Sequence, residues 1–156
     1  MVLLFFAKVL VFRLDPLLHG LISQVQSAFV RRRSIHENFK FVCNTAWLLH
    51  HRKVPAVLMK IDISKAFDTL SWEFILKLLI QRGFGRRWCS WICGLMCTAS
   101  SSVMVNGETG DPFALASGVR QGDPLSPTLF ILDMDTLQAM LHWATRHNIL
   151  PDMGLG

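Results

Sequence analysis

Residues 57–63, with the sequence VLMKIDI, form an apolar run that carries a carboxylate, and this segment constrains the fold more than any other. An apolar run of this length that follows Pro55 is typical of a buried strand. Successive side chains of a strand point to opposite faces, so one face would be wholly apolar and would pack on a helix. The other face would carry Leu58, Lys60 and Asp62. We therefore predict a strand over 57–63 that presents a charged group to whatever lies across the sheet.

A carboxylate on such a strand is costly unless a cation accompanies it, either a basic side chain or a divalent metal ion. Magnesium is usually held by one or two carboxylates, with water and substrate phosphates completing its ligands. Asp62 at the end of the strand fits that description. The alternative is a structural role, in which Asp62 caps the next helix or pairs with Lys65. The residue types alone leave both interpretations open.

Helical periodicity follows the strand. Ser71 is placed as an N-cap, and Glu73 lies in the first turn, where the helix dipole favours negative charge. Apolar residues then recur at helical spacing as far as Gly83, which ends the helix. A second helix repeats this spacing, with a set of apolar residues that we expect in the core: Trp88, Trp91, Ile92 and Leu95.

Two helices are predicted upstream of the strand. Residues 3–22 have helical character, which Pro16 and Gly20 interrupt. Their apolar start is too short to span a bilayer, so we interpret it as a core helix and expect no membrane partner. Residues 36–53 form the other helix, with an apolar face made of Phe39, Val42, Ala46 and Leu49.

A hairpin, a loop and a final helix follow. The Asn106-Gly107 pair within an alternating stretch predicts a tight two-residue turn. In the next loop, Gly122 permits close approach of the backbone to a ligand, and the Gln121 amide can both donate to and accept from a base or sugar. Ser126 followed by Pro127 predicts the start of a helix, because the N–H that proline lacks would be unpaired there anyway. The order of elements is an α+β pattern within a single domain.

The charge of the chain favours a polyanionic partner. The 156 residues carry a formal charge of +5, and the basic residues cluster at 31–33, 50–53 and 82–87. Such patches suit nucleic acid, although a basic surface also serves solubility alone.

Three cysteines, Cys89, Cys93 and Cys97, recur every four residues in the second helix after the strand. This spacing matches neither the usual zinc pairs nor the common iron–sulfur motifs. We therefore interpret them as buried structural thiols, which indicates a reducing compartment.

Longer segments, in this order and spacing, resemble the reverse transcriptases of non-LTR (LINE-type) retrotransposons, particularly the plant kind. They are KIDISKAFDTLSWEF, GFGRRWCSWI, TASSSVMVNGETGDPF and GVRQGDPLSPTLFIL, preceded by AKVLVFRLDPLLHGLIS and QSAFVRRRSIHEN, which are similar to finger segments of those enzymes. The resemblance covers nearly the whole chain. It implies a partial right-hand polymerase, with a fingers-like part over about 1–56 and an incomplete palm over about 57–150, in which helices pack on a small antiparallel sheet.

The resemblance also implies roles for individual residues. Asp62 matches the first catalytic carboxylate, which binds Mg²⁺, and Ile63 would offer its backbone carbonyl to one of the ions. Phe67 matches an aromatic residue that crowds the sugar 2′ position and selects deoxynucleotides. Residues that match contacts to the incoming nucleotide or template are Arg120, Gln121, Gly122 and Arg33. The implied cofactor is Mg²⁺, and the implied partners are an RNA template, a DNA primer and deoxynucleoside triphosphates.

The sequence departs from the family pattern at two places. Arg31 and Arg32 stand where Pro-Gly usually precedes Arg33, so we expect an altered finger turn. The family also has a Tyr/Phe-Ala-Asp-Asp hairpin, whereas this chain contains neither an Asp-Asp pair nor a tyrosine. Asp133 and Asp135 lie on divergent faces of a predicted helix and cannot replace that pair. We therefore expect a truncated domain that binds Mg²⁺ weakly and is inactive alone, because two-metal catalysis needs further carboxylates.

Other interpretations remain. The chain could be a non-catalytic remnant that binds nucleic acid through its basic patches. A phosphotransferase with Asp62 as nucleophile is disfavoured, since Ser64 stands where such enzymes usually place a second aspartate. No address signal is visible, so the sequence leaves the location open, with the nucleus and the cytoplasm as the intracellular alternatives. The absent hairpin predicts an unpaired strand edge with exposed apolar faces.

Overall fold

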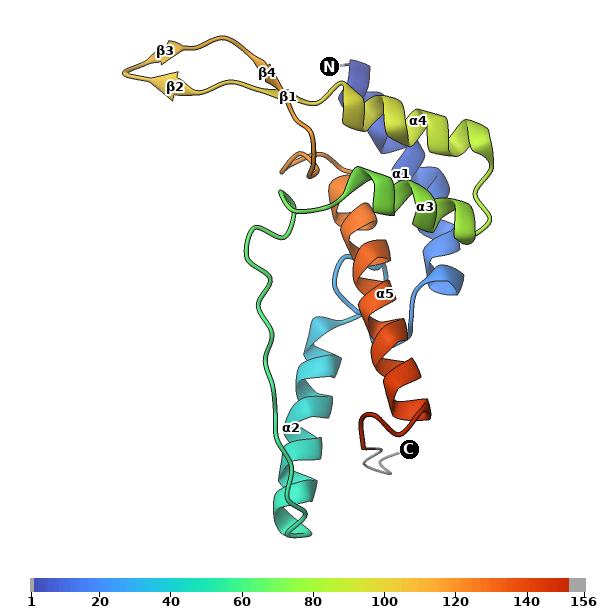
Figure 1. Cartoon of the computed structure of the whole chain (residues 1–156). Coiled ribbons are helices and arrows are strands. Elements are labelled where there is room, and N and C mark those ends of the chain that lie inside the picture. The colour runs from blue at the N-terminus through green and yellow to red at the C-terminus, as the bar shows by residue number, and fades with distance from the viewer. Residues whose placement is uncertain (1, 152–156) are drawn as a thin grey trace.

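The computed structural model describes residues 2–151, in which five helices and four short strands follow one another (Figure 1). The helices are α1 (Val2–Leu21), α2 (Ile35–His51), α3 (Trp72–Gln81), α4 (Arg86–Cys97) and α5 (Ser126–Arg146). The strands are β1 (Ser100–Ser101), β2 (Met104–Val105), β3 (Glu108–Thr109) and β4 (Phe113–Ala114). These elements confirm the predicted α+β class.

The core lies between α1, α3, α4 and the start of α5, which gather in the upper half of Figure 1. Burying a leucine or isoleucine side chain stabilises the fold by about 1.5–3 kcal/mol. Each of these helices therefore gains most of its stability from the apolar stripe that it buries. The most deeply buried side chains are Leu10, Leu14 and Leu18 of α1, Ile75 and Leu79 of α3, Ile92 of α4, and Ile131 and Leu132 of α5.

Helix α1 is continuous, so the prediction that Pro16 and Gly20 interrupt it is wrong. A proline inside a helix removes a backbone hydrogen bond and costs about 3 kcal/mol. Pro16 lies on the exposed side of α1, whereas Leu14 and Leu18 on the opposite side are buried. Burial of that stripe outweighs the loss of one hydrogen bond.

Helices α3 and α4 agree with the predictions. The Ser71 hydroxyl accepts a hydrogen bond from the backbone N–H of Phe74 at 3.3 Å, so Ser71 is the N-cap of α3. Gly83 follows the helix with φ of 85°, a conformation that glycine adopts without strain. Among the cysteines of α4, Cys89 is buried, but Cys93 is half-buried and Cys97 is exposed. The prediction of buried thiols is therefore wrong for the last two.

The strands form one long two-stranded arm that projects away from the helices (Figure 1). Met104 pairs with Thr109 and Val105 with Glu108 across the tight turn, and β1 pairs with β4 further along the arm. Asn106 and Gly107 both have positive φ, as a type I′ turn requires, so the predicted hairpin is confirmed. The arm does not cover the core; the helices pack on one another instead.

The segment predicted as a strand, 57–63, is not one. It is extended, yet no hydrogen bond is found for residues 55–64, and Val57 is 94% exposed. A strand is stabilised by pairing with another strand, and within residues 2–151 the strands pair only inside the arm. The expected packing of its apolar face on a helix is therefore absent from the described chain, and Val57, Met59 and Ile61 are exposed. The predicted unpaired strand edge is not found at this segment, because the segment is not a strand.

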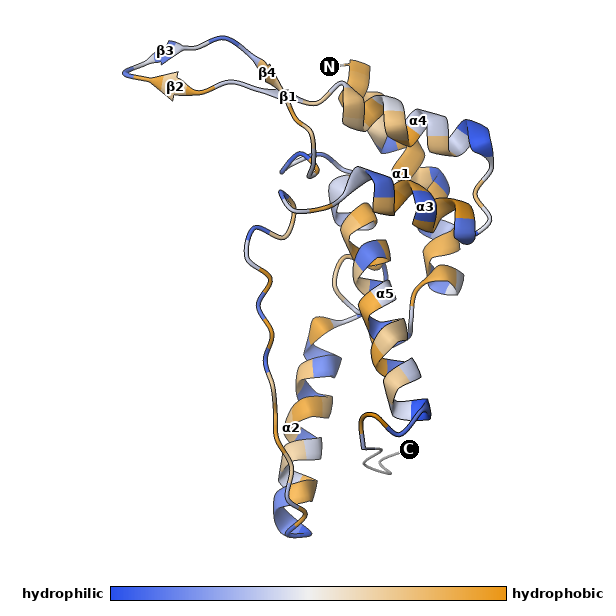
Figure 2. Cartoon of the chain, viewed as in Figure 1, coloured by the Kyte–Doolittle hydropathy of each residue, from blue (hydrophilic) through white to orange (hydrophobic). Residues whose placement is uncertain are grey.

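Helix α2 confirms the helix predicted over 36–53, but it stands apart from the core and buries no residue. A groove of about 410 Å³ separates it from the extended segment that returns beside it, with Val42, Ala46 and Leu49 on one wall and Val57 on the other. Figure 2 shows apolar residues on both elements. No helix within residues 2–151 is both long and apolar enough to cross a membrane.

Candidate nucleotide and template site

Two segments that are far apart in the sequence meet through their backbones. The turn after the extended segment places the Phe67 carbonyl 2.8 Å from the N–H of Val119, which donates to it. The N–H of Gly118 donates to the Leu70 carbonyl, also at 2.8 Å. This pairing fixes the Phe67 turn against the loop that carries Arg120, Gln121 and Gly122.

Gly118 permits the contact because it lacks a side chain. A Cβ atom at this position would lie 2.7 Å from the Asp68 carbonyl oxygen and 2.9 Å from that of Phe67. Its φ of 78° also lies in the region that favours glycine. The Trp72 indole N–H donates to the Gly118 carbonyl at 2.6 Å, so the first residue of α3 holds the same loop.

The Phe67 side chain is half-buried and packs on α5. Its ring centroid lies 5.3 Å from that of Phe130, with the planes tilted by 45°. A hollow of about 290 Å³ lies between this turn and α5, and Ile63, Phe130 and Asp133 contribute to its lining. Burial raises the pKa of the Asp133 carboxyl, because the charged form loses water.

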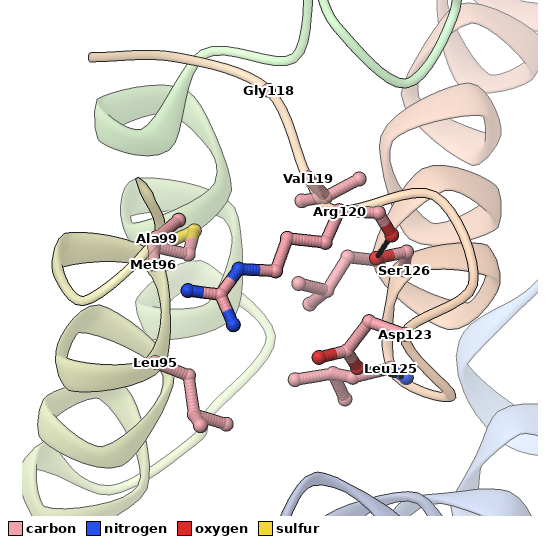
Figure 3. A pocket seen from close by; sticks show the side chains of 10 residues that line it. Leu95, Met96, Ala99, Gly118, Val119, Arg120, Asp123, Leu125 and Ser126 are labelled. Atoms are coloured by element: carbon pink, nitrogen blue, oxygen red, sulfur yellow. Dashed lines mark hydrogen bonds between the residues drawn. The ribbon is translucent and has the colours of Figure 1, made fainter. Parts of the chain in front are cut away.

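Arg120 points into the protein, towards the end of α4 (Figure 3). Its Nη2 donates to the Thr98 carbonyl at 2.7 Å, while Nε is buried and finds no hydrogen-bond partner among the described residues. A cavity of about 30 Å³ lies beside the guanidinium and is lined also by Asp123, with room for about one water molecule. In this conformation Arg120 positions the loop and does not reach out to a ligand.

Gln121 and Gly122 occupy the exposed tip of the loop, and Gly122 has φ of 87°. The loop is tied to α5 at its far end, where the Ser126 hydroxyl donates to the Arg120 carbonyl at 2.6 Å. Ser126 is the first residue of α5 and Leu125 is its N-cap, so the predicted helix start is confirmed. The serine side chain stabilises the loop instead of the helix end.

Asp62 and Ile63 lie on the exposed extended segment just before the Phe67 turn. Within residues 2–151, no three His, Cys, Asp or Glu side chains converge on a point that could hold a metal ion. Asp62 brings one carboxylate and Ile63 one carbonyl, which are too few oxygens to hold two magnesium ions. The described residues therefore do not form a complete two-metal site.

Arg33 lies away from this loop, after α1. Its Nη1 donates to the carbonyls of Ser23 and Gln26, at 2.5 and 2.6 Å, and so closes the connection between α1 and α2. The turn before it keeps an ordinary geometry, with the Arg33 N–H donating to the Val30 carbonyl at 3.2 Å. Arg32 has φ of 63°, the conformation in which a type II turn favours glycine. A hydrogen-bonded turn thus forms at Arg31 and Arg32, while its expected difference from the turn of the family stays a prediction.

Sequence reasoning missed an ionic contact that joins three helices. Asp135 of α5 is buried, and its carboxylate accepts from Nη2 of Arg82 at 2.6 Å and from the N–H of Ser23 at 2.7 Å. Arg82 also donates to the Leu21 carbonyl. One arginine of the 82–87 basic patch is therefore structural. The sequence did hold a signal for this contact, because Asp135 places a carboxylate within an apolar helix and aspartate is rarely buried unless it is paired.

The chain matches a family of nucleic acid polymerases over nearly its whole length. It belongs to the reverse transcriptase (RNA-dependent DNA polymerase) family, whose model matches residues 5–150. This match confirms the family that the sequence motifs predict.

Individual relatives come from transposable elements. The Retrovirus-related Pol polyprotein from type-1 retrotransposable element R2 of Popillia japonica is 35% identical over 85 residues, 54% of this chain and 14% of that protein. The Transposon TX1 uncharacterized 149 kDa protein of Xenopus laevis is 27% identical over 149 residues, 94% of this chain and 11% of that protein. The type-2 element R2DM polyprotein of Drosophila melanogaster is 38% identical over 80 residues, 51% of this chain and 8% of that protein. The chain thus spans between 8% and 14% of the length of these relatives.

Proposed function

We propose that this chain is the part of an RNA-directed DNA polymerase that receives the incoming deoxynucleotide and the template. The pairing of the Phe67 turn with the loop at Gly118 and Val119 carries this proposal. This pairing places Phe67, which matches the sugar-selecting residue of the family, against the loop of Gln121 and Gly122. That loop matches the segment of the family that contacts the nucleotide and the template. Neither segment could hold its place alone, because both lack regular secondary structure.

Each residue has a distinct part in this proposal. Phe67 packs on Phe130, so its ring has a fixed position from which to exclude a 2′-hydroxyl. Gln121 and Gly122 form the exposed tip that meets the base and the sugar. Asp62 and Ile63 supply part of the oxygen ligands of a divalent cation. Because the described residues do not complete that site, we expect no nucleotidyl transfer by this chain alone.

Arg33 lies apart from the Phe67 turn and from the loop of Gln121 and Gly122. Its Nη1 is engaged with two backbone carbonyls. A contact to the phosphates would therefore use the remaining N–H groups of the guanidinium. We propose this contact only as a secondary one.

A binding experiment tests the proposal directly. The full chain is titrated with a fluorescent deoxynucleoside triphosphate and with the matching ribonucleotide, in the presence of a primed RNA template and Mg²⁺. We expect the deoxynucleotide to bind more tightly, and Phe67→Ala to reduce that preference. Phe113→Ala, which removes an exposed ring from the arm, is the matched control. Equal binding of the two nucleotides by the unaltered chain would refute the proposed role.

A polymerisation assay with the same components tests the incomplete metal site. We expect no extension of the primer. Extension that Asp62→Ala abolishes would show that the chain assembles a working site after all.

The second candidate function is binding of nucleic acid without catalysis. It is favoured by exposed basic residues at three places: Arg31 and Arg32, Arg52 and Lys53, and Arg86 and Arg87. Raising the salt concentration weakens such electrostatic binding, with a logarithmic slope of about 0.9 for each phosphate of duplex DNA that the protein neutralises. A steep slope without discrimination between nucleotides would favour this second function. A salt-independent affinity would exclude it.

A further inference from the structure

The two cysteines near the end of α4 form a pair of thiols in contact. Sγ of Cys93 and Sγ of Cys97 lie 3.8 Å apart and share a hydrogen bond. The buried stripe of the same helix consists of Cys89, Ile92 and Met96, so the pair lies beside the core and not within it. Cys97 is exposed and Cys93 half-buried, which leaves the pair open to solvent. Neither thiol takes part in the nucleotide and template site.

From this geometry we infer that Cys93 and Cys97 bind a soft divalent cation of the zinc and cadmium class through both sulfurs. Zinc–sulfur bonds of about 2.3 Å at tetrahedral angles place two sulfurs about 3.8 Å apart. The observed separation of 3.8 Å therefore already matches one edge of a tetrahedral thiolate site. Such an ion needs no rearrangement of the helix in order to bind both sulfurs.

A disulfide fits the same pair less well. It requires Cβ atoms about 3.5–4.5 Å apart. Residues four apart on an α-helix hold their Cβ atoms about 5–6 Å apart, so closing the bond would distort the last turn of α4. Bridging by an ion avoids this distortion, because the ion spans the gap.

The charge balance also favours a divalent ion. Binding removes one proton from each thiol to solvent, and the ion exchanges two of its water ligands for the two sulfurs. Two thiolates at the C-terminal end of a helix would be unfavourable alone, because the helix dipole is negative there. The ion cancels both charges.

The site would be an open one. No third His, Cys, Asp or Glu of the described residues joins the two sulfurs, so water completes the coordination. Gly94, between the two cysteines in the sequence, has nothing within 4 Å of its Cβ position, which leaves room at this side of the helix. Thr98 follows Cys97 directly, and its carbonyl accepts the hydrogen bond of Arg120. A bound ion would therefore also stabilise the helix end on which the Arg120 loop is anchored.

A titration with Cd²⁺ alone, on the full chain reduced with a phosphine, tests the assignment through the ultraviolet absorption of the cadmium–thiolate bond. We expect saturation at one equivalent, displacement by Zn²⁺ and no displacement by Mg²⁺. Cys93→Ser and Cys97→Ser should each weaken binding of the ion by at least ~10-fold. Loss of a residue that only hydrogen-bonds to a metal ligand already weakens metal binding by about that factor, and loss of a ligand itself should cost no less. Cys43→Ser is the matched control, because Cys43 is an exposed thiol on another helix.

Circular dichroism of the serine variants verifies that α4 still folds. Cadmium should raise the melting temperature of the unaltered chain and of Cys43→Ser only, because an ion stabilises the form that binds it. No absorption band, or a band that survives both serine substitutions, would overturn the assignment. The assignment would also be overturned if the peptide that contains Cys93 and Cys97 lost the mass of two hydrogens in air, because that loss would show a disulfide.

Discussion

Replacing Gly118 with alanine tests the contact on which the candidate site depends. The left-handed conformation at this residue, with φ of 78°, costs an alanine about 1–2 kcal/mol. The new Cβ would also lie 2.7 Å, 2.8 Å and 2.9 Å from three backbone atoms of Asp68 and Phe67, so the two segments must separate. Their separation weakens the hydrogen bonds from Gly118 to Leu70 and from Val119 to Phe67, each worth about 1 kcal/mol. The total loss of unfolding free energy is roughly 3–4 kcal/mol.

Gly83→Ala is the matched control for this experiment. Gly83 has φ of 85° but nothing within 4 Å of its Cβ position, so its substitution carries only the conformational cost of about 1–2 kcal/mol. Urea unfolding followed by circular dichroism measures both variants, and the midpoint should fall further for Gly118→Ala at an unchanged slope. Equal midpoints for the two variants would refute the close approach of the segments. Nucleotide discrimination should also be lost in Gly118→Ala and kept in Gly83→Ala.

Three further predictions concern other parts of the chain. Arg32→Gly should raise the unfolding free energy by about 1 kcal/mol, because glycine adopts the φ of 63° without strain; a lower urea midpoint would contradict this. Asp135→Ala should cost about 3 kcal/mol, since it leaves Arg82 without its buried partner. Lys77→Ala, which breaks an exposed pair, should cost far less, and a similar loss in both variants would argue against the buried pair. The raised pKa of Asp133 means that the folded chain binds a proton more tightly, so stability falls as pH rises above the ordinary aspartate pKa of about 3.9. Asp133→Asn should flatten this fall in melting temperature between pH 4 and pH 7, and an unchanged profile would exclude Asp133 as its source.

The exposed apolar surface has a consequence for handling of the chain. The groove between α2 and the extended segment, and the segment itself, expose side chains such as Val42, Val57 and Ile61. Large exposed apolar patches and unpaired extended backbone promote association. This surface lies outside the core, so the helices of the core can remain folded while chains associate through it.

Local chemistry determined those features that the sequence alone predicted. The N-cap at Ser71, the glycine after α3 and the Asn106-Gly107 turn each depend on a few neighbouring residues, whose conformational preferences do not need the rest of the fold. The family could also be predicted, because its motifs are continuous segments. The site residues Asp62, Phe67 and Gln121 were predicted in this way, each within one short stretch of sequence, and their roles stay predictions.

Tertiary structure decided what depends on contacts between distant residues. The extended segment at 57–63 has the sequence of a strand, but a strand exists only where a second one supplies hydrogen bonds. Arg120 looked like a ligand contact, yet Thr98 at the end of α4 turns its guanidinium inward. Pro16 looked like a helix break, yet burial of the leucines opposite it keeps α1 whole. A sequence determines which local structures have a low free energy. The burial and strand pairing that select among these structures are properties of the assembled fold.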